Sequence, residues 1–203
     1  MKKGFTLIEL LIVIAILAIL ATTVVLTLNP AQLLAETRDG QRISDLGTIQ
    51  SAISLYLASV ANPKLSFRGS CAAQCFSHNS DVTQAGCAGA GTARHSSTAG
   101  GGATKDAVAS TTLSRAVDGL GWVPVEFSAI SGGAPFAIVP IDPSNTSTYF
   151  YTYACNEPTK TFELDAKMES TRYAQTGSGD VESKDGGDID TLYEVGNDPN
   201  LNQ

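Results

Sequence analysis

Residues 1–28 read MKKGFTLIELLIVIAILAILATTVVLTL, and this stretch decides the fold of the N-terminal part of the chain. Two lysines and a glycine lead into an apolar run that contains one acid, Glu9, and residues 10–28 have no charged side chain. A helix of about 20 apolar residues crosses a bilayer core, so the run predicts a membrane-spanning helix. A carboxylate at the centre of such a helix costs about 2.5–3.5 kcal/mol on insertion scales. We therefore expect Glu9 to be functional and to have a partner.

Two simpler interpretations of this N-terminus explain less. A secretory signal peptide has a shorter apolar core and a small-x-small cleavage site after it, whereas residues 26–30 read LTLNP. An ordinary membrane anchor explains the length of the run and the cytoplasmic lysines. It does not explain Glu9 or the Gly4-Phe5 junction.

Residues 2–11, KKGFTLIELL, resemble the leader of type IV pilins and type II secretion pseudopilins. The resemblance implies that a prepilin peptidase cuts after Gly4, removing residues 1–4, and N-methylates Phe5. It also implies a single-pass protein of the inner membrane, in contact with lipid, that an assembly platform transfers into a filament of identical subunits at the cell surface. Glu9 matches the acidic position of that family.

Cleavage would create an ammonium group on Phe5, four residues before Glu9 and on the same helical face. Both charges are unfavourable in an apolar surrounding unless they are paired. Our hypothesis is that Glu9 of an incoming subunit meets the Phe5 ammonium of a neighbour and so sets the axial register. Neutralisation within one chain is the competing account.

The helix of residues 5–29 is expected to continue as an amphipathic helix over 30–60, with a kink at Asn29-Pro30 because proline removes a backbone donor. Charged residues at 38, 39, 42 and 45 fall mostly on other faces than the apolar stripe. The stripe should lie against a globular domain. Its members are Leu34, Ile43, Leu46, Ile49, Ile53, Tyr56 and Leu57.

Residues 61–116 are rich in Gly, Ala, Ser and Thr and predict a long loop on the flank of the domain. The loop holds Cys71, Cys75 and Cys87, and the fourth cysteine is Cys155. Together with His78, the loop cysteines could ligate zinc, but their spacing fits no standard zinc pattern. Disulfides are the preferred interpretation, because an exported head lies where they persist. We expect one bridge to join Cys155 to Cys71 or Cys87.

Residues 117–203 predict a β-rich head, so the fold class is α+β: a long N-terminal helix packed on a small antiparallel sheet. Residues 122–127 form a short extended segment, and 148–155 and 160–168 alternate as a hairpin. One face of the hairpin should pack on the helix and the other should face solvent. The tyrosines of 148–155 would be core, or alternatively an aromatic binding platform. Residues 192–195 are expected to form a last strand.

The C-terminal region is acidic, and Asp185, Asp188 and Asp190 lie close together around two glycines. Short carboxylates in such a loop suit calcium. The segment resembles in place and composition the calcium-stabilised loop of major pseudopilins, although it does not match an EF-hand. A solvated acidic tail is the alternative, and the sequence implies no other cofactor.

The formal net charge of −7 disfavours direct nucleic-acid binding, which needs a basic patch. The chain has two histidines and shows no phosphate loop, nucleophile elbow or His-centred triad, so we expect no enzyme. The predicted function is that of a structural subunit of a type IV pilus-like filament. The alternatives are a type II secretion pseudopilin and, from another class, a monomeric membrane-anchored binding domain outside the cytoplasm.

Overall fold

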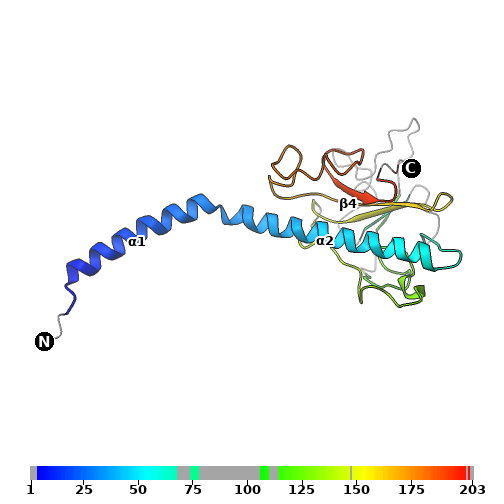
Figure 1. The fold of residues 1–203 in the computed structure, drawn as a ribbon, viewed down its shortest axis with the longest axis horizontal. Coiled ribbons are helices and arrows are strands. Elements are labelled where there is room, and N and C mark those ends of the chain that lie inside the picture. The colour runs from blue at the N-terminus through cyan, green and yellow to red at the C-terminus, as the bar shows by residue number, and fades with distance from the viewer. Residues whose placement is uncertain are drawn as a thin grey trace.

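The computed structural model describes residues 4–24, 29–67, 114–146, 148–199 and 201, together with the backbone of 25–28, 74–77 and 106–109. Two consecutive helices lead into a β-rich head (Figure 1). The elements are α1 (Leu7–Leu28), α2 (Pro30–Ser59), β1 (Gln74–Ser77), β2 (Asp106–Ala109), a 3-10 turn η1 (Phe127–Ala129), β3 (Thr152–Asn156), β4 (Thr161–Ala166) and β5 (Tyr193–Gly196). The predicted α+β class is confirmed.

The two helices meet at Asn29, which has the left-handed backbone angles φ 40° and ψ 75°. Left-handed geometry ends a helix, and Pro30 then begins α2 at the position where a missing N–H costs nothing. The predicted kink is confirmed. As a result α1 extends away from the head, whereas the C-terminal half of α2 packs along it (Figure 1).

The apolar stripe of α2 is buried from Leu46 onward, where the helix reaches the head. Leu46, Ile49 and Ile53 are fully buried and Tyr56 is nearly so. Leu34 is 59% exposed, because it lies on the part of α2 nearer α1, before the main core begins. The predicted stripe is therefore correct for its C-terminal half and wrong at Leu34.

The sheet has the order β2-β1-β3-β4-β5. Strands β3, β4 and β5 are antiparallel neighbours, and the predicted hairpin is β3–β4, with Asn156 opposite Thr161. The predicted last strand is β5. Strands β1 and β2 lie within the Gly-rich stretch, where composition predicted no strand; β1 is antiparallel to β3 and parallel to β2.

Residues 122–127, predicted as a short extended segment, form no strand of this sheet. Their one bridge pairs Glu126 with Asp118, and the chain then enters η1. The segment is held instead by burial, since Trp122 is 1% exposed and its indole Nε1 donates to the Pro140 carbonyl at 2.9 Å. Apolar side chains that fill the core do not require a strand to position them.

Both faces of β4 are buried, which corrects the expectation of a solvent-facing side. Phe162, Leu164 and Ala166 pack in the core cluster with residues of α2. On the opposite face Glu163 and Asp165 are 1% and 0% exposed. The C-terminal segment contributes to this cover, because the Leu201 amide donates to Glu163 Oε2 at 2.8 Å. Alternation along the strand predicted the two faces but not the second covering layer.

A buried ionic cluster joins α2 to the head, although the sequence placed its helix residues away from the core. Arg42 and Asp39 are both 0% exposed. The Arg42 guanidinium donates to both carboxylate oxygens of Asp142, at 2.7 and 3.0 Å, and to Asp39 Oδ1 at 2.7 Å. Asp39 also accepts the backbone amides of Glu169 and Ser170. The interior between α2 and these loops is thus polar and saturated with hydrogen bonds.

Replacing Ile53 by Ala is expected to lower the free energy of unfolding of the head by about 2–5 kcal/mol, because it leaves a cavity in a fully buried site. Trp122, the single tryptophan, is buried in the same cluster and reports unfolding by its fluorescence. The neighbouring exposed Ser54→Ala is the control and should change stability by no more than about 0.5 kcal/mol. Equal effects of the two substitutions would contradict the packing described.

Candidate functional site

The predicted cleavage junction lies at an open end of the molecule. Residues 4–6 precede α1 without helical structure. Phe5 is 87% exposed, and a side-chain carbon built at Gly4 would meet no atom within 4 Å. The Gly4-Phe5 peptide bond is thus accessible to a peptidase within the described structure.

Glu9 lies beside this junction in a capping box. Its Oε2 accepts the Thr6 backbone amide at 2.8 Å and the Thr6 hydroxyl at 2.7 Å. In return the Glu9 amide donates to Thr6 Oγ1 at 3.3 Å. This reciprocal arrangement satisfies two donors at the helix N-terminus. The carboxylate therefore points back toward residue 5. The pattern Thr6-x-x-Glu9 is the sequence signature of a capping box, but this local role of Glu9 was not predicted.

Helix α1 exposes its apolar side chains on all sides. Its segment Leu7–Val24 has a mean hydropathy of 2.8 with 0% of its residues buried, and it is long and apolar enough to cross a membrane. Leu10, Ile14 and Leu17 are 60%, 56% and 58% exposed. An apolar surface of this extent requires lipid or other helices as cover.

Residues 1–25 match the prokaryotic N-terminal methylation motif. This is the signal motif of type IV pilins and pseudopilins, as the resemblance of residues 2–11 implied. The motif supports a pilin-like or pseudopilin-like substrate of prepilin peptidase and points to a structural protein. No curated protein and no solved structure matches the chain.

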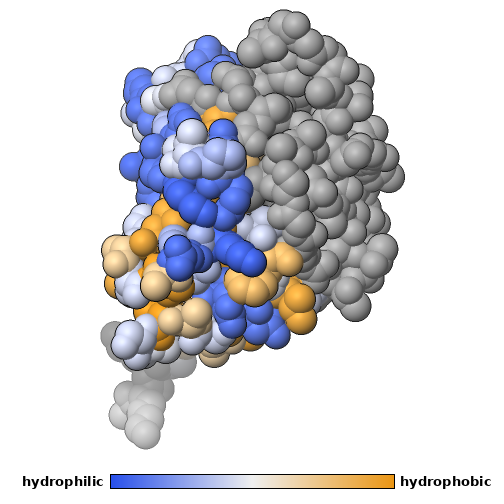
Figure 2. Space-filling view, turned by 90° about the vertical axis from the view of Figure 1, so that its right-hand side faces the viewer, coloured by the Kyte–Doolittle hydropathy of each residue, from blue (hydrophilic) through white to orange (hydrophobic). Residues whose placement is uncertain are grey.

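The head presents a mixed surface in contrast to α1. Seen from the end opposite α1, the coloured residues are largely hydrophilic, interrupted by hydrophobic patches (Figure 2). The molecule thus has two parts: α1, whose apolar surface must be shielded from water, and the head, whose more polar surface can be solvated.

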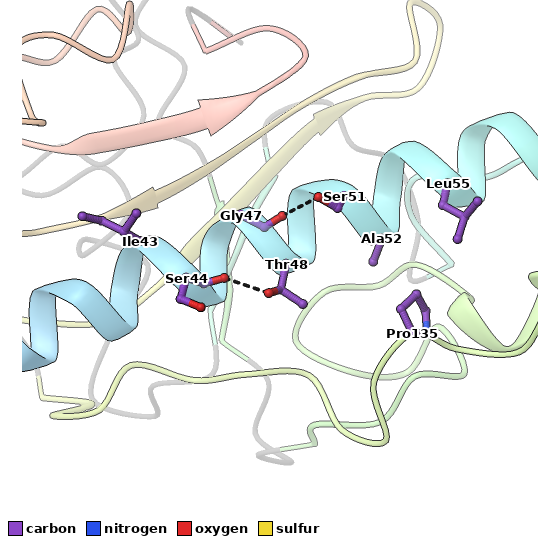
Figure 3. Close-up of a pocket in the computed structure, with 8 residues that line it drawn as sticks. All are labelled: Ile43, Ser44, Gly47, Thr48, Ser51, Ala52, Leu55 and Pro135. Atoms are coloured by element: carbon purple, nitrogen blue, oxygen red, sulfur yellow. Dashed lines mark hydrogen bonds between the residues drawn. The ribbon is translucent and has the colours of Figure 1, made fainter.

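A groove of about 460 Å³ runs along the outer side of α2, with Pro135 on its other wall (Figure 3). Its helix side is made mainly of small residues. The Thr48 and Ser51 hydroxyls bond the helix backbone at Ser44 and Gly47, both at 2.8 Å. The lining includes no titratable side chain, so the groove has the character of a packing surface rather than of an active site.

The tyrosines of the predicted platform belong mainly to the core. Tyr151 and Tyr153 are 2% and 0% exposed, and their hydroxyls donate to Asp45 Oδ2 and to the Leu65 carbonyl, each at 3.0 Å. Tyr149 is half-buried, with the Arg42 guanidinium 5.1 Å from its ring centre. The row therefore packs rather than binds, and the platform alternative is wrong.

Cys155 is buried and disulfide-bonded in the structure. Cys71 and Cys87, as well as His78 of the zinc alternative, lie outside the described residues, and Cys75 is described only in its backbone. Cys75 lies opposite Ala154 in the register rather than opposite Cys155. The pairing of Cys155 with Cys71 or Cys87 stays a prediction.

The predicted calcium-binding aspartates do not converge. Asp188 and Asp190 are exposed, whereas Asp185 is occupied by the backbone amides of Gly187 and Glu194, at 2.9 and 2.6 Å. Among the described residues, the group of three acids close enough to hold one metal ion is Glu163, Asp165 and Glu194. Burial raises the pKa of Glu163 to about 8 and that of Glu194 to about 9.

Proposed function

We propose that the chain is a structural subunit of a type IV pilus-like filament, assembled through its N-terminal helix after cleavage at Gly4. The observation that supports this most is α1, which combines the methylation motif with an apolar surface that is exposed over Leu7–Val24. In the membrane, lipid would cover that surface. In a filament, the α1 helices of neighbouring subunits would replace the lipid.

The geometry of the two helices agrees with this role. Because α1 leaves the head at the Asn29 kink (Figure 1), α1 helices can bundle along an axis while the heads remain outside. The head is attached to α2 by the buried Arg42 cluster and by the hydrophobic core that α2 shares with the sheet. A pull on α1 would thus be transmitted to the head.

Mass spectrometry of the protein recovered from its native membrane and from sheared cell surfaces tests the processing step. We expect a mature chain that begins at Phe5 and carries one N-terminal methyl group. Its mass should also be lower by the thiol hydrogens that are lost when disulfides form. A Gly4→Glu variant is the control and should keep residues 1–4. Recovery of the wild-type chain with its leader intact would contradict the proposal.

Electron microscopy of the sheared material distinguishes the alternatives. Surface filaments that contain this chain support the pilus subunit. A processed chain that stays in the cell envelope as short assemblies indicates a pseudopilin, whereas a processed chain that is monomeric in mild detergent indicates an anchored binding domain. Either of the last two results would overturn the proposal.

A further inference from the structure

Three carboxylates converge on the face of the sheet that lies away from α2. Asp165 of β4 lies opposite Glu194 of β5 in the register, and Glu163 is two residues before Asp165, on the same face of β4. One oxygen from each side chain lies within 4.8 Å of the others. The three residues are 1% exposed or less.

Glu194 is incompletely satisfied within this cluster. Its Oε2 accepts the Ile189 amide at 2.9 Å, but its Oε1 is buried and has no hydrogen-bond partner. No described lysine or arginine forms an ion pair with it. A buried carboxylate in this state is strongly unfavourable unless a proton or a cation neutralises it.

The surroundings of Glu194 are built to hold its carboxylate in place. The loop of residues 185–190 passes so close that a side-chain carbon at Gly187 would lie 2.0 Å from Glu194 Oε2, so only glycine fits there. Asp185 accepts the Glu194 amide from the same loop. From β3, the Thr152 hydroxyl donates to Asp165 Oδ2 at 2.9 Å. The oxygens are therefore fixed by their neighbours before any ligand arrives.

A cavity lies beside Glu194 at the edge of the sheet. It has a volume of about 210 Å³, and Glu194, Gly196, Asp185 and Pro199 are among its lining residues. The cavity lies at β5, the edge strand, and Glu194 is the member of the three acids that lines it.

We propose that Glu163, Asp165 and Glu194 bind one calcium ion, which ties β4 to β5 and to the 185–190 loop. Three carboxylates offer hard oxygen ligands in the mono- or bidentate modes that calcium accepts. Magnesium requires a smaller, near-octahedral site and keeps several waters, which this closely covered cluster does not readily hold. The site uses strand residues, not the Asp188 and Asp190 carboxylates of the exposed loop.

Calcium titration of the full-length chain in detergent micelles tests this assignment, with binding followed by calorimetry and unfolding followed by Trp122 fluorescence. We expect one calcium per chain. At a calcium concentration about 100 times the dissociation constant, the melting temperature should rise by about 5 °C or more over the chelator-treated protein. Magnesium at the same concentration should raise it much less.

Two variants locate the site. Glu194→Gln keeps the shape of the side chain and should abolish calcium binding, while its calcium-free melting temperature stays equal to or above that of the calcium-free wild type, since the amide is neutral without a bound proton or cation. Asp190→Asn, in the exposed loop, should bind calcium as the wild type does. The proposal is overturned if the wild type binds no calcium, if Glu194→Gln still binds it, or if magnesium binds equally well. Absence of binding by the folded wild type would show that protons neutralise the cluster.

Discussion

Replacing Glu9 by Lys is expected to abolish filament assembly while the chain still inserts into the membrane. After cleavage the reversed charge would repel the Phe5 ammonium of a neighbouring subunit instead of pairing with it. An unpaired charge in an apolar helix bundle is costly. The measurement is the amount of chain in sheared filaments relative to the amount in the membrane fraction, which should fall to background.

The capping box makes it possible to separate the charge of Glu9 from its local structural role. Glu9→Gln removes the charge but keeps a side chain that can accept the Thr6 amide, because glutamine serves in capping boxes. Thr6→Ala keeps the charge and removes the cap, at a cost of about 1 kcal/mol to the helix. If charge pairing drives assembly, Glu9→Gln should fail and Thr6→Ala should form filaments.

The opposite result for these two variants would indicate that Glu9 acts by capping the helix of its own chain. Filaments from Glu9→Gln together with their loss in Thr6→Ala would mean that Glu9 acts through the helix N-terminus of its own chain. Normal filaments from Glu9→Lys would contradict the pairing hypothesis directly. The membrane fraction is the control in each case, since α1 retains its apolar length in all three variants.

Replacing Arg42 by Met should destabilise the head by about 3–5 kcal/mol, because breaking a buried ion pair leaves its partner uncompensated. Asp142 would lose two hydrogen bonds, and Asp39 would lose one while keeping the amides of residues 169 and 170. The measurement is urea unfolding followed by Trp122 fluorescence.

Two further variants test whether the loss arises from the unpaired acid. Adding Asp142→Leu to Arg42→Met should recover part of the stability, since the second substitution removes the uncompensated charge. Arg172→Ala breaks the more exposed pair with Glu36, whose atoms are 3.3 Å apart, and should cost less than about 1 kcal/mol. A loss in Arg42→Met no larger than in Arg172→Ala would contradict a stabilising cluster.

The N-terminal part of the molecule could be predicted from the sequence because its determinants are local. Uninterrupted hydrophobicity predicts α1, and Asn29-Pro30 predicts its end, which depends on backbone geometry within two residues. The Gly4-Phe5 junction and Glu9 belong to a contiguous motif, so no tertiary contact is needed to find them. The hairpin β3–β4 is similar, since alternation and a short turn define it.

The polar interior of the head was not predictable in the same way. Arg42 and Asp142 are separated by 100 residues in sequence, and neither position differs in type from a surface charge. The acids of β4 alternate as those of a solvent-facing strand do, and among the described residues the C-terminal segment and the 185–190 loop contact that face and help to bury it. The acidic composition near 185–190 predicted metal ligands in the loop itself, and no local pattern indicated that the fold brings Glu194 close to Glu163 and Asp165.

By itself, then, the sequence determined the N-terminal methylation motif, the helix whose apolar side chains are exposed, and the place where that helix ends. These properties depend on neighbouring residues and on the free energy of transferring apolar side chains out of water. Neither requires a tertiary contact. Only the tertiary structure decided which charged side chains are buried and which of them meet. Burial of a charge depends on partners and covering segments from distant parts of the chain, and that information is absent from any local pattern.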